Sequence, residues 1–230
     1  PVKLLFDRQE SLIVHPKRHA TQIRVKVGAK RDGTLTAVET ELFGDTGAYA
    51  SLGEKVLTRA TTHSSGPYEI PNVKADCYAM YTNNPPAGAF RGFGVMQSAF
   101  AIESMMDTLA ETLNINPVEL RKKNALRVGS VTNTGQVLRE SVGLMECIEK
   151  VEAEMNRLSG GDPFTPKLVD GAPHLIRAWG IAVGYKNTGL GGGAPDKSGA
   201  EVELRRDGTF QVRSSSAELG QGLPTVLQVI

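Results

Sequence analysis

Apolar and polar residues alternate in two stretches of the chain, and each alternation predicts a β-hairpin. In residues 21–44 the pattern runs on both sides of the Asp-Gly pair at 32–33, and in residues 199–216 it runs on both sides of the Asp-Gly pair at 207–208. An Asp-Gly pair between two alternating runs is a strong signal for a tight hairpin turn. The same unit used twice suggests two similar lobes, although Asp-Gly turns are common enough that the match could be a coincidence.

Helical spacing of apolar residues predicts a long helix over residues 95–113. The residues that follow this spacing are Met96, Phe100, Met105, Met106, Leu109 and Leu113. Apolar residues at intervals of three and four positions share one face of a helix, which can then pack against the rest of the fold.

Capping signals and amphipathic spacing predict three further helices. Asn116 can cap a helix that has Pro117 at its first position and runs to about residue 126. Residues 143–158 form an amphipathic run, and a last helix is expected to begin near Pro224.

Glycine and proline divide the chain near its last third. Residues 159–174 contain three glycines and three prolines with little periodicity, so we interpret this stretch as a linker. Strand character resumes in residues 175–189. Hairpins mixed with helices, without strict alternation of strand and helix, predict an α+β fold made of two mixed α/β lobes. We expect the first lobe over residues 1–158 and the start of a truncated second lobe over residues 175–230.

Both ends of the chain are predicted to lie inside secondary structure. The opening residues, PVKLLFD, have the character of the middle of a strand, and the last residues, GLPTVLQVI, begin a helix. We interpret the chain as an internal piece of a longer polypeptide, in which both lobes are incomplete. A trimmed but complete domain is the alternative.

Charge and cysteine content narrow the function classes. The 230 residues carry 26 basic and 25 acidic side chains, a net charge of +1, which argues against broad electrostatic binding to nucleic acid or to an acidic membrane surface. No window approaches the roughly 18 apolar residues of a membrane span. Cys77 and Cys147 form no C-x-x-C motif, so this chain alone cannot build a zinc ribbon or an iron–sulfur cluster. Two free thiols favour a reducing cytoplasm.

Several stretches resemble metal, nucleotide or catalytic sites but lack what those sites require. Residues 191–198, GGGAPDKS, place Asp196 where a phosphate-binding loop has glycine before its lysine, and a strand rather than a helix is expected to follow. His15 and His19 in HPKRH lack an accompanying acidic ligand pattern, so we interpret this stretch as a solvated basic loop rather than a zinc site. His63 is interpreted as a packed or hydrogen-bonded histidine.

Residues 88–94, GAFRGFG, place three glycines, an arginine and two phenylalanines at the entrance of the helix predicted over 95–113. Glycine lets the backbone turn sharply or lie close to a ligand, and the first turn of a helix presents unpaired N–H groups and the positive end of its dipole. Arg91 adds a permanent charge with a flat fork of donors, and Phe90 and Phe93 could form an apolar wall for a planar ring. These features favour a negatively charged partner; a tight turn with two buried phenylalanines is the alternative.

A second glycine turn precedes the last predicted helix. Gly220, Gln221 and Gly222 lie between a strand and that helix, and the side-chain amide of Gln221 could donate a hydrogen bond. Two such junctions, one in each expected lobe, suggest an extended anionic ligand between the lobes.

Together these motifs resemble one protein family. The stretch RATTHSSGPYEIPNVKADCYAMYTNNPPAGAFRGFGVMQ resembles the molybdenum-binding part of the xanthine dehydrogenase and aldehyde oxidase family, and SAELGQG resembles that family's later pterin-contacting loop. NPVELRKKNAL and the two Asp-Gly hairpins fall in the order that the family shows. The resemblance covers essentially the whole chain, which looks like an internal third of the molybdenum subunit and is most similar to bacterial N-heterocycle hydroxylases of the xanthine or nicotinate type.

The resemblance implies a set of cofactors and partners. Molybdenum would be held by the dithiolene of molybdopterin cytosine dinucleotide, with no protein side chain as a direct metal ligand. The enzyme would hydroxylate an electron-poor carbon of a small N-heterocycle, with oxygen from water and a glutamate as base. Electrons would leave through [2Fe–2S] clusters to FAD on partner domains or subunits, which suits the low cysteine count here. The complete complex would be a cytoplasmic homo-oligomer.

The resemblance also implies roles for individual residues. Phe90, Arg91 and Gly92 would lie beside the molybdenum and its pterin, where Arg91 would orient the substrate and stabilise developing charge. Phe93 would stack on the substrate ring. Arg59 matches a second substrate-facing arginine that the purine-oxidising members have. A preorganised donor at such a position contributes roughly 2.7–4 kcal/mol to transition-state stabilisation.

The resemblance extends to the second glycine turn but also has gaps. Gly220, Gln221 and Gly222 match the loop that contacts the pterin and phosphate portion of the cofactor. The family's second stacking phenylalanine is expected near Leu190, where no aromatic residue stands. The catalytic glutamate and an earlier GGFGGK loop belong to segments that this chain does not contain, and Glu218 is interpreted as structural.

Two further interpretations stay open at this point. The chain could be a non-catalytic fragment or a scaffold paralogue with a binding or assembly role, or it could contain a nucleotide-binding module built on residues 191–198. Arg59, Arg91 and Phe93 favour a molybdenum hydroxylase for the parent protein. The missing glutamate predicts that this polypeptide by itself is inactive.

Overall fold

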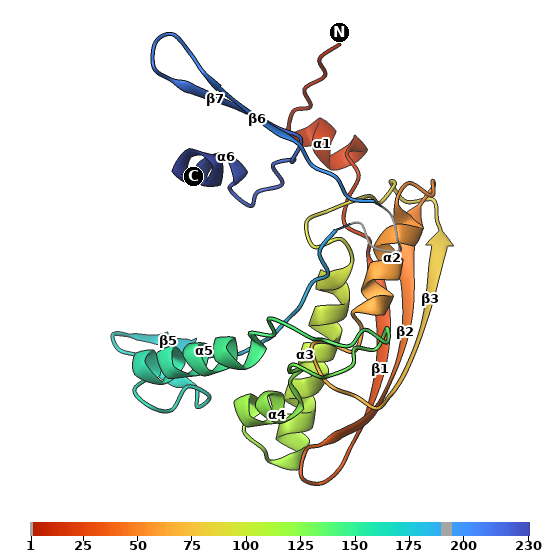
Figure 1. Ribbon diagram of the computed structural model, residues 1–230. Coiled ribbons are helices and arrows are strands. Elements are labelled where there is room, and N and C mark those ends of the chain that lie inside the picture. Colours follow the sequence, from red (N-terminus) through yellow and green to blue (C-terminus); the bar gives the residue numbers. More distant parts are fainter. Residues whose placement is uncertain (1, 190–194) are drawn as a thin grey trace. The chain divides into compact units, whose positions relative to one another are not determined.

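The predicted hairpins and helices form in the structure, joined by elements that the sequence patterns did not indicate. The computed structural model describes residues 2–189 and 195–230, and the chain divides into two units, residues 1–185 and 186–230 (Figure 1). The first unit contains α1 (Arg8–Val14), β1 (Thr21–Ala29), β2 (Leu35–Gly47), α2 (Gly53–Thr62), β3 (Asn72–Tyr81), α3 (Val95–Leu113), α4 (Pro117–Asn124), α5 (Leu144–Ser159), β4 (Lys167–Val169) and β5 (Ala172–Arg177). The second contains β6 (Ala200–Leu204), β7 (Phe210–Ser214) and α6 (Leu223–Val229). Within the described ranges, no helix is long and apolar enough to cross a membrane.

The main sheet has the strand order β1-β2-β3. β1 and β2 are the antiparallel hairpin predicted around residues 32–33, and β6 and β7 are the hairpin predicted around residues 207–208. β3 pairs with β2 in parallel, and a parallel pair needs a crossover connection, which α2 provides. Residues 35–81 therefore contain a βαβ unit that the alternation of apolar residues did not reveal.

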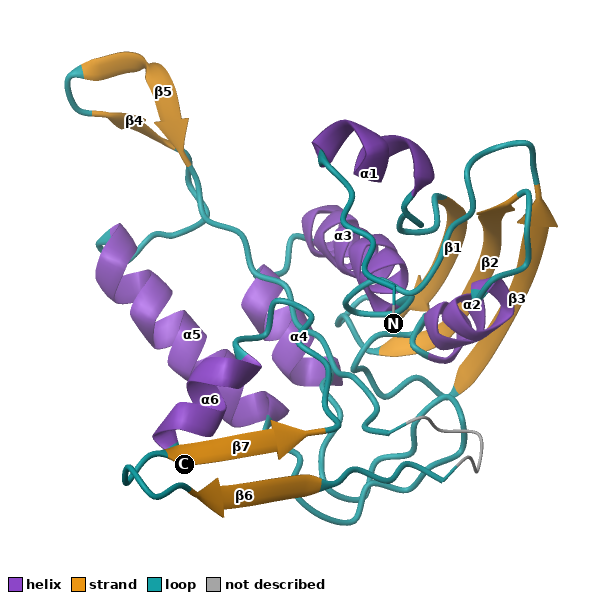
Figure 2. Cartoon of the chain, turned by 90° about the horizontal axis from the view of Figure 1, so that it is seen from above, coloured by secondary structure: helices purple, strands orange, loops and turns teal. Residues whose placement is uncertain are grey.

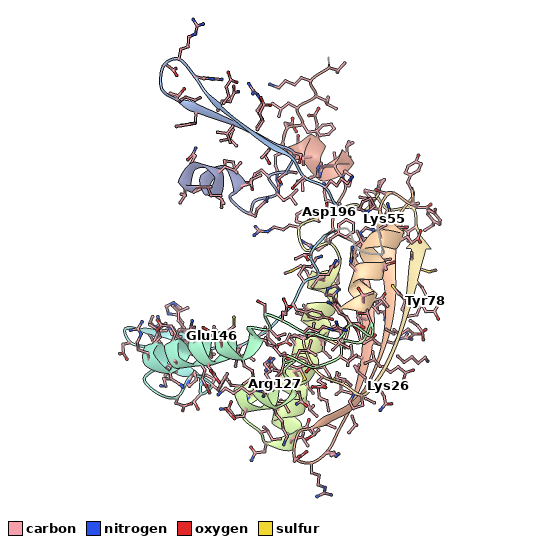
Figure 3. All side chains as sticks on the ribbon, in the orientation of Figure 1. Lys26, Lys55, Tyr78, Arg127, Glu146 and Asp196 are labelled. Atoms are coloured by element: carbon pink, nitrogen blue, oxygen red, sulfur yellow. The ribbon has the colours of Figure 1, made fainter. Side chains whose placement is uncertain are left out.

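α2 and α3 cover one face of this sheet and leave the other face open (Figure 2). Val38 on the covered face is 3% exposed. Gly44 continues the same inward series, and an ideal Cβ there would come within 2.4 Å of Leu57, so α2 packs against bare backbone at this point. On the open face the rings of Phe43 and Tyr78 stack 5.0 Å apart, and Figure 3 shows Tyr78 directed away from the helices.

Helix α3 covers the predicted residues, and its buried stripe overlaps the predicted apolar series in part: Met106 is buried and Leu109 packs against the core. Met96 is 56% exposed and Phe100 is 78% exposed, although their spacing placed them on the apolar stripe. The stripe that is buried has a spacing of four and includes Ser98, Ile102, Met106 and Ala110. Small and polar residues make up half of this stripe, so hydrophobicity alone did not indicate that Ser98 and Ala110 are buried.

The helices after α3 follow the predicted signals. The Asn116 side chain accepts hydrogen bonds from the backbone N–H groups of Val118 at 2.8 Å and Glu119 at 3.3 Å, so it caps α4 as predicted. α5 and α6 confirm the helices expected over residues 143–158 and near Pro224. The stretch 159–174 contains the end of α5, β4 and the start of β5. The division of the chain into lobes at this stretch stays a prediction.

The strand predicted at the start of the chain does not form. Residues 2–7 have no regular secondary structure, and Val2 is 98% exposed and Leu5 83% exposed. A strand needs the backbone of a neighbouring strand for its hydrogen bonds, and no described residue pairs with this stretch.

The strand predicted over residues 175–189 ends early, at Arg177. Beyond it, Ile181 packs into an apolar cluster with residues of α4 and α5. The Val183 backbone N–H donates to the Glu103 carboxylate at 3.0 Å instead of to a strand. Ile181 is therefore buried by helices rather than by a sheet.

A buried ion pair joins α3 to α4. The fully buried Arg121 donates from Nε to Glu103 Oε2 at 2.8 Å and from Nη2 to Asp107 Oδ1 at 2.8 Å. The Tyr68 hydroxyl donates to the other oxygen of Glu103. Burial and the Glu103 charge raise the pKa of Tyr68, so its hydroxyl remains a donor. This network ties the GPYEIPN stretch to α3.

Arg121→Met is expected to lower the free energy of unfolding by about 3–5 kcal/mol, because it leaves the Glu103 carboxylate buried without its main partner. Urea titration measures the loss. Arg157→Met is the matched control, since Arg157 donates to Glu154 at 2.7 Å on the exposed surface of α5. Exposed pairs of this kind contribute little to stability, because water and salt screen them. Equal losses in the two variants would contradict the structural role given to the buried pair.

Candidate functional site

The GAFRGFG motif forms the loop between β3 and α3, and its backbone makes two overlapping turns. The Phe93 N–H donates to the Phe90 carbonyl at 2.7 Å, and the Val95 N–H donates to the Gly92 carbonyl at 3.1 Å. The φ angles of Gly92, Phe93 and Gly94 are +95°, +46° and +96°. A left-handed backbone at a non-glycine residue costs about 1–3 kcal/mol, and such strain is concentrated at functional sites. The surrounding structure must therefore hold Phe93 in this conformation.

Gly94 makes the closest contact between this loop and α2. An ideal Cβ at Gly94 would lie 2.0 Å from the Val56 carbonyl oxygen and 2.9 Å from the Ala60 backbone nitrogen. Because both atoms belong to the backbone of a helix, no side chain can move aside to make room. Only glycine lets the start of α3 lie this close to α2.

Arg59 lies between these two contact residues in the sequence, in the last turn of α2. Its side chain is half-buried, and its guanidinium makes no hydrogen bond or ion pair with any residue that the structure describes. The contact of Gly94 with Val56 and Ala60 brings this turn of α2 against the motif loop. The structure therefore places two of the predicted site segments next to each other.

The loop leaves part of its motif accessible. Arg91 is exposed, Phe90 is 48% exposed and Phe93 is half-buried. The alternative of a tight turn with two buried phenylalanines is therefore wrong. α3 begins at Gly94 without a side-chain cap, so no side chain offsets the positive end of its dipole. A helix start and an arginine together suit an anion, and the exposed ring suits a planar group.

His63 anchors the end of α2, as the interpretation of a hydrogen-bonded histidine predicted. It is 5% exposed, and its Nδ1 lies 2.8 Å from the Arg59 carbonyl oxygen. Its ring lies 4.8 Å from the ring of Tyr185, whose hydroxyl donates to the Thr62 carbonyl at 3.3 Å. Burial raises the pKa of Tyr185, which keeps the hydroxyl protonated for this bond.

The second glycine turn, in the unit of residues 186–230, is closed by Glu218. Its carboxylate accepts hydrogen bonds from the backbone N–H groups of Gly222 at 3.2 Å and Leu223 at 2.6 Å, and also from Gly220. Desolvation acts to raise the pKa of Glu218, but these hydrogen bonds outweigh it and lower the pKa. Gln221 donates from Nε2 to the Ala217 carbonyl at 2.7 Å. Glu218 is therefore structural, as predicted, and it holds amides that were predicted for a ligand.

Part of the sequence discussed above lies outside the described residues. This applies to Leu190, where a second stacking phenylalanine was expected, and to residues 191–194 of GGGAPDKS. Asp196 is exposed, and β6 follows shortly after it, where a phosphate-binding loop requires a helix.

The prediction of a solvated basic loop at HPKRH is wrong for its last residues. His15 is exposed, but His19 is 2% exposed. Within the described residues, both ring nitrogens of His19 lack a hydrogen-bond partner, as do the buried Nη1 of Arg18 and Oε1 of Gln97. No three His, Cys, Asp or Glu side chains in the described ranges are grouped to hold a metal ion. Sequence reasoning missed this cluster because a run of basic residues ordinarily indicates a solvated surface.

Gly94→Ala should destabilise the fold more than Gly129→Ala does. Both glycines have nearly the same φ, +96° and +95°, but an ideal Cβ at Gly129 has nothing within 4 Å. A left-handed alanine costs about 1–2 kcal/mol, which is the loss expected at Gly129. At Gly94 the new methyl group must also push α2 away. Equal losses in the free energy of unfolding would show that close helix packing does not explain the glycine.

His19 is expected to make stability depend on pH. Desolvation lowers the pKa of His19 below its ordinary value of 6.5, against the opposing charge of Asp45. Because the unfolded chain takes up this proton at a higher pH than the folded chain, stability is lost as the pH falls through the unfolded value toward the folded one. His19→Gln should flatten the dependence of the unfolding free energy as the pH falls through the ordinary value of 6.5. His15→Gln is the exposed control, and an unchanged profile in His19→Gln would refute the assignment.

Comparison with known protein families connects the two units to one function class. Two family models, each described as a molybdopterin cofactor-binding domain, match residues 1–125 and residues 166–230. The first match alone covers more than half of the chain. It contains both α2 and the motif loop, and the second contains the turn closed by Glu218.

Curated relatives are much longer than this chain. The nicotinate dehydrogenase large molybdopterin subunit of Eubacterium barkeri is 50% identical over 160 residues, which are 70% of this chain and 38% of that protein. A probable xanthine dehydrogenase subunit from Bacillus subtilis is 34% identical over 230 residues, which are 100% of this chain and 30% of that protein. The chain thus spans 30–38% of the length of these relatives.

Solved structures show the same architecture. Quinoline 2-oxidoreductase from Pseudomonas putida 86 matches with a TM-score of 0.71 and 26% identity, over 97% of this chain and 30% of that chain. Aldehyde oxidoreductase from Desulfovibrio gigas matches with a TM-score of 0.64 and 30% identity, over 86% of this chain and 21% of that chain. The mixed α/β fold is therefore that of the molybdenum-binding part of these enzymes. Sequence models, relatives and fold agree that this chain belongs to the molybdopterin cofactor-binding family, as part of a molybdenum-binding subunit of the xanthine dehydrogenase and aldehyde oxidase type.

Proposed function

We propose that the chain forms part of the cofactor and substrate site of a molybdenum hydroxylase that acts on a small N-heteroaromatic compound. The observation that carries the proposal is the loop at residues 90–94. It leaves Phe90 and Arg91 accessible at an uncapped helix start and contacts the turn of α2 that carries Arg59. Family membership supports the cofactor class, and this loop supports where the cofactor binds.

The groups around the loop suit an anionic, planar cofactor. Residues 88–97 contain no acidic side chain, and they offer the Arg91 guanidinium and the N–H groups at the start of α3. These donors fit molybdopterin, and we assign Phe90, Arg91 and Gly92 to hold it.

When bound, a molybdenum–pterin supplies the two-electron oxidation and the water-derived oxygen by which an electron-poor carbon is hydroxylated. The residues of this chain bind and orient the substrate. Attack at a ring carbon places negative charge on ring nitrogens, an exocyclic oxygen or a carboxylate, and Arg59 and Arg91 would stabilise that charge. Phe93, held half-buried with a left-handed backbone, would stack on the substrate ring.

The second glycine turn is assigned to the pterin and phosphate portion on the strength of the resemblance. Gly220 and Gly222 donate to the Glu218 carboxylate in this structure. A phosphate that bound to these same amides would displace the Glu218 carboxylate. The carboxylate is itself an anionic group, so the turn has donors that suit an anion. Gln221 would contribute its side-chain amide.

Three of the similar proteins support the substrate class. Nicotinate dehydrogenase, xanthine dehydrogenase and quinoline 2-oxidoreductase are all named for nitrogen heterocycles. Two arginines beside an aromatic side chain suit such a ring, because charge on its nitrogens or on a carboxylate can be paired with a guanidinium. A small N-heteroaromatic substrate is therefore favoured over an aliphatic aldehyde.

The proposal extends to the whole complex. We propose the cytosine dinucleotide form of the cofactor, [2Fe–2S] clusters and FAD on partner domains or subunits, and a homo-oligomeric, cytoplasmic complex. Cys77 and Cys147 are both free thiols, so four-cysteine clusters need ligands from outside this chain. Free thiols are also typical of a reducing compartment.

Arg59→Ala in the complete protein tests the proposal. We expect kcat for nicotinate or xanthine to fall by about 10²–10³-fold, the loss typical of one preorganised charge-stabilising donor, while molybdenum and pterin contents stay close to those of the wild type. Lys55→Ala is the matched control, because Lys55 is an exposed cation one turn earlier on the same helix. It should leave both turnover and cofactor content unchanged.

The possible results test the role of Arg59 separately from the proposed function of the protein. A loss of molybdenum in proportion to the loss of activity would refute a substrate-facing role for Arg59. Absence of molybdenum and pterin from the wild-type complex would refute the proposed function and would leave the interpretation of a non-catalytic scaffold.

A further inference from the structure

The segment of residues 17–19, between α1 and β1, is bonded to both ends of the motif loop. At the start of the motif, the Lys17 N–H donates to the Pro86 carbonyl at 3.4 Å, and the Gly88 N–H donates to the Lys17 carbonyl at 2.9 Å. These two bonds form a parallel bridge between Lys17 and Ala87. Downstream of the motif, the Gln97 side chain donates from Nε2 to the His19 carbonyl at 3.2 Å.

Arg18 reaches the centre of the motif from the middle of this segment. Its Nη2 donates to the Arg91 carbonyl at 2.7 Å, and its Cζ lies 4.5 Å from the centroid of the Phe90 ring. A planar guanidinium can make both contacts at once, because its face stacks on a ring while its edge donates hydrogen bonds. One side chain thus fixes the backbone of Arg91 and the ring plane of Phe90.

Stabilisation of the fold does not explain why Arg18 and Gln97 are buried here. Nη1 of Arg18 is buried and has no hydrogen-bond partner among the described residues, and the same is true of Gln97 Oε1. Buried polar groups without partners are rare in proteins because they destabilise the fold. The Arg18 side chain nevertheless contacts the motif loop, and the Gln97 side chain, from the first turn of α3, bonds the segment of residues 17–19.

We propose that Arg18 is a positioning residue for the cofactor and substrate site: it holds Phe90 and Arg91 in place without itself contacting the substrate. The loop needs such support because its backbone is left-handed through three successive residues, one of them Phe93. The inference rests on the proposed function for the identity of the site, but the support of the loop can be measured separately.

Hydrogen–deuterium exchange in the complete protein, prepared without cofactor, measures this support directly. The amides of Phe93 and Val95 form the turn hydrogen bonds, so peptides covering residues 88–100 report on the loop. In Arg18→Met we expect these amides to exchange about tenfold faster, because the loop opens locally more often. Arg18→Lys keeps the charge but lacks the planar fork, and it should not restore protection.

Arg24→Met is the matched control. Arg24 also stacks on a phenylalanine, with its Cζ 5.5 Å from the Phe43 ring, and it pairs with Glu41 at 3.0 Å, but it lies on the open face of the sheet. It should leave exchange in residues 88–100 unchanged. In cofactor-loaded protein, Arg18→Met should lower kcat by about 10–100-fold with little change in KM, as expected for misplaced reacting groups.

Protection in residues 88–100 that is the same in Arg18→Met and Arg24→Met would overturn the proposal, as would full restoration by Arg18→Lys. If Arg18→Met does not fold, exchange in residues 88–100 is compared between Arg18→Lys and Arg24→Lys, and only Arg18→Lys should exchange faster than the wild type. If residues 88–100 exchange faster in Arg18→Met but the wild-type protein binds no molybdenum, the role of Arg18 in supporting the loop stands and the proposed function is refuted. Failure of the proposal for Arg18 and failure of the proposed function are therefore distinguishable.

Discussion

The contact between Gly94 and the backbone of α2 is the constraint on which the site depends. The 2.0 Å separation between an ideal Cβ and the Val56 carbonyl oxygen means that the start of α3 can take this position only without a side chain. Once it does, the loop must reach the helix through left-handed turns, and Phe90 and Arg91 remain accessible at its outer edge. Helix packing, turn geometry and exposure of the arginine are therefore consequences of one close approach.

Two further sets of contacts keep this arrangement in place. The network of Tyr68, Glu103 and Arg121 ties α3, the helix that follows the loop, to α4 and to the segment before β3. At the other end, Asp45 accepts hydrogen bonds from the Gly47 backbone at 2.8 Å and from the Thr82 hydroxyl at 2.6 Å. These bonds fix the point at which the chain leaves β3 toward the motif. Rigid supports on both sides suit a loop that must present charged and aromatic groups in fixed positions.

Local signals in the sequence were sufficient for elements whose geometry is set by neighbouring residues. Asp-Gly turns predicted both hairpins, and Asn116 predicted the start of α4. The buried face of α3 was predictable only in part, because Glu103 is buried with a partner distant in the sequence, Arg121 of α4. The same reason applies to His19, which belongs to a basic run and is buried where the start of α2, at Gly53, packs against its ring.

The residues of the candidate site also differ in whether a local sequence signal identifies them. Arg91, Phe93 and the glycines were found from the motif, whereas Arg59 depended on the family resemblance, since a lone arginine in a helix carries no local signal. Arg18 was missed altogether, because its contacts with Phe90 and Arg91 join residues more than 70 positions apart. Residues that support a site through tertiary contacts are visible only once the fold is known.

The most direct test of this account is the position of molybdenum in crystals of the complete protein, located by anomalous scattering at the metal's absorption edge. The account predicts a molybdenum peak beside residues 90–92, with the pterin in contact with the same loop and Arg59 facing the same space. A peak remote from this loop, with Arg91 surrounded only by protein and solvent, would contradict it.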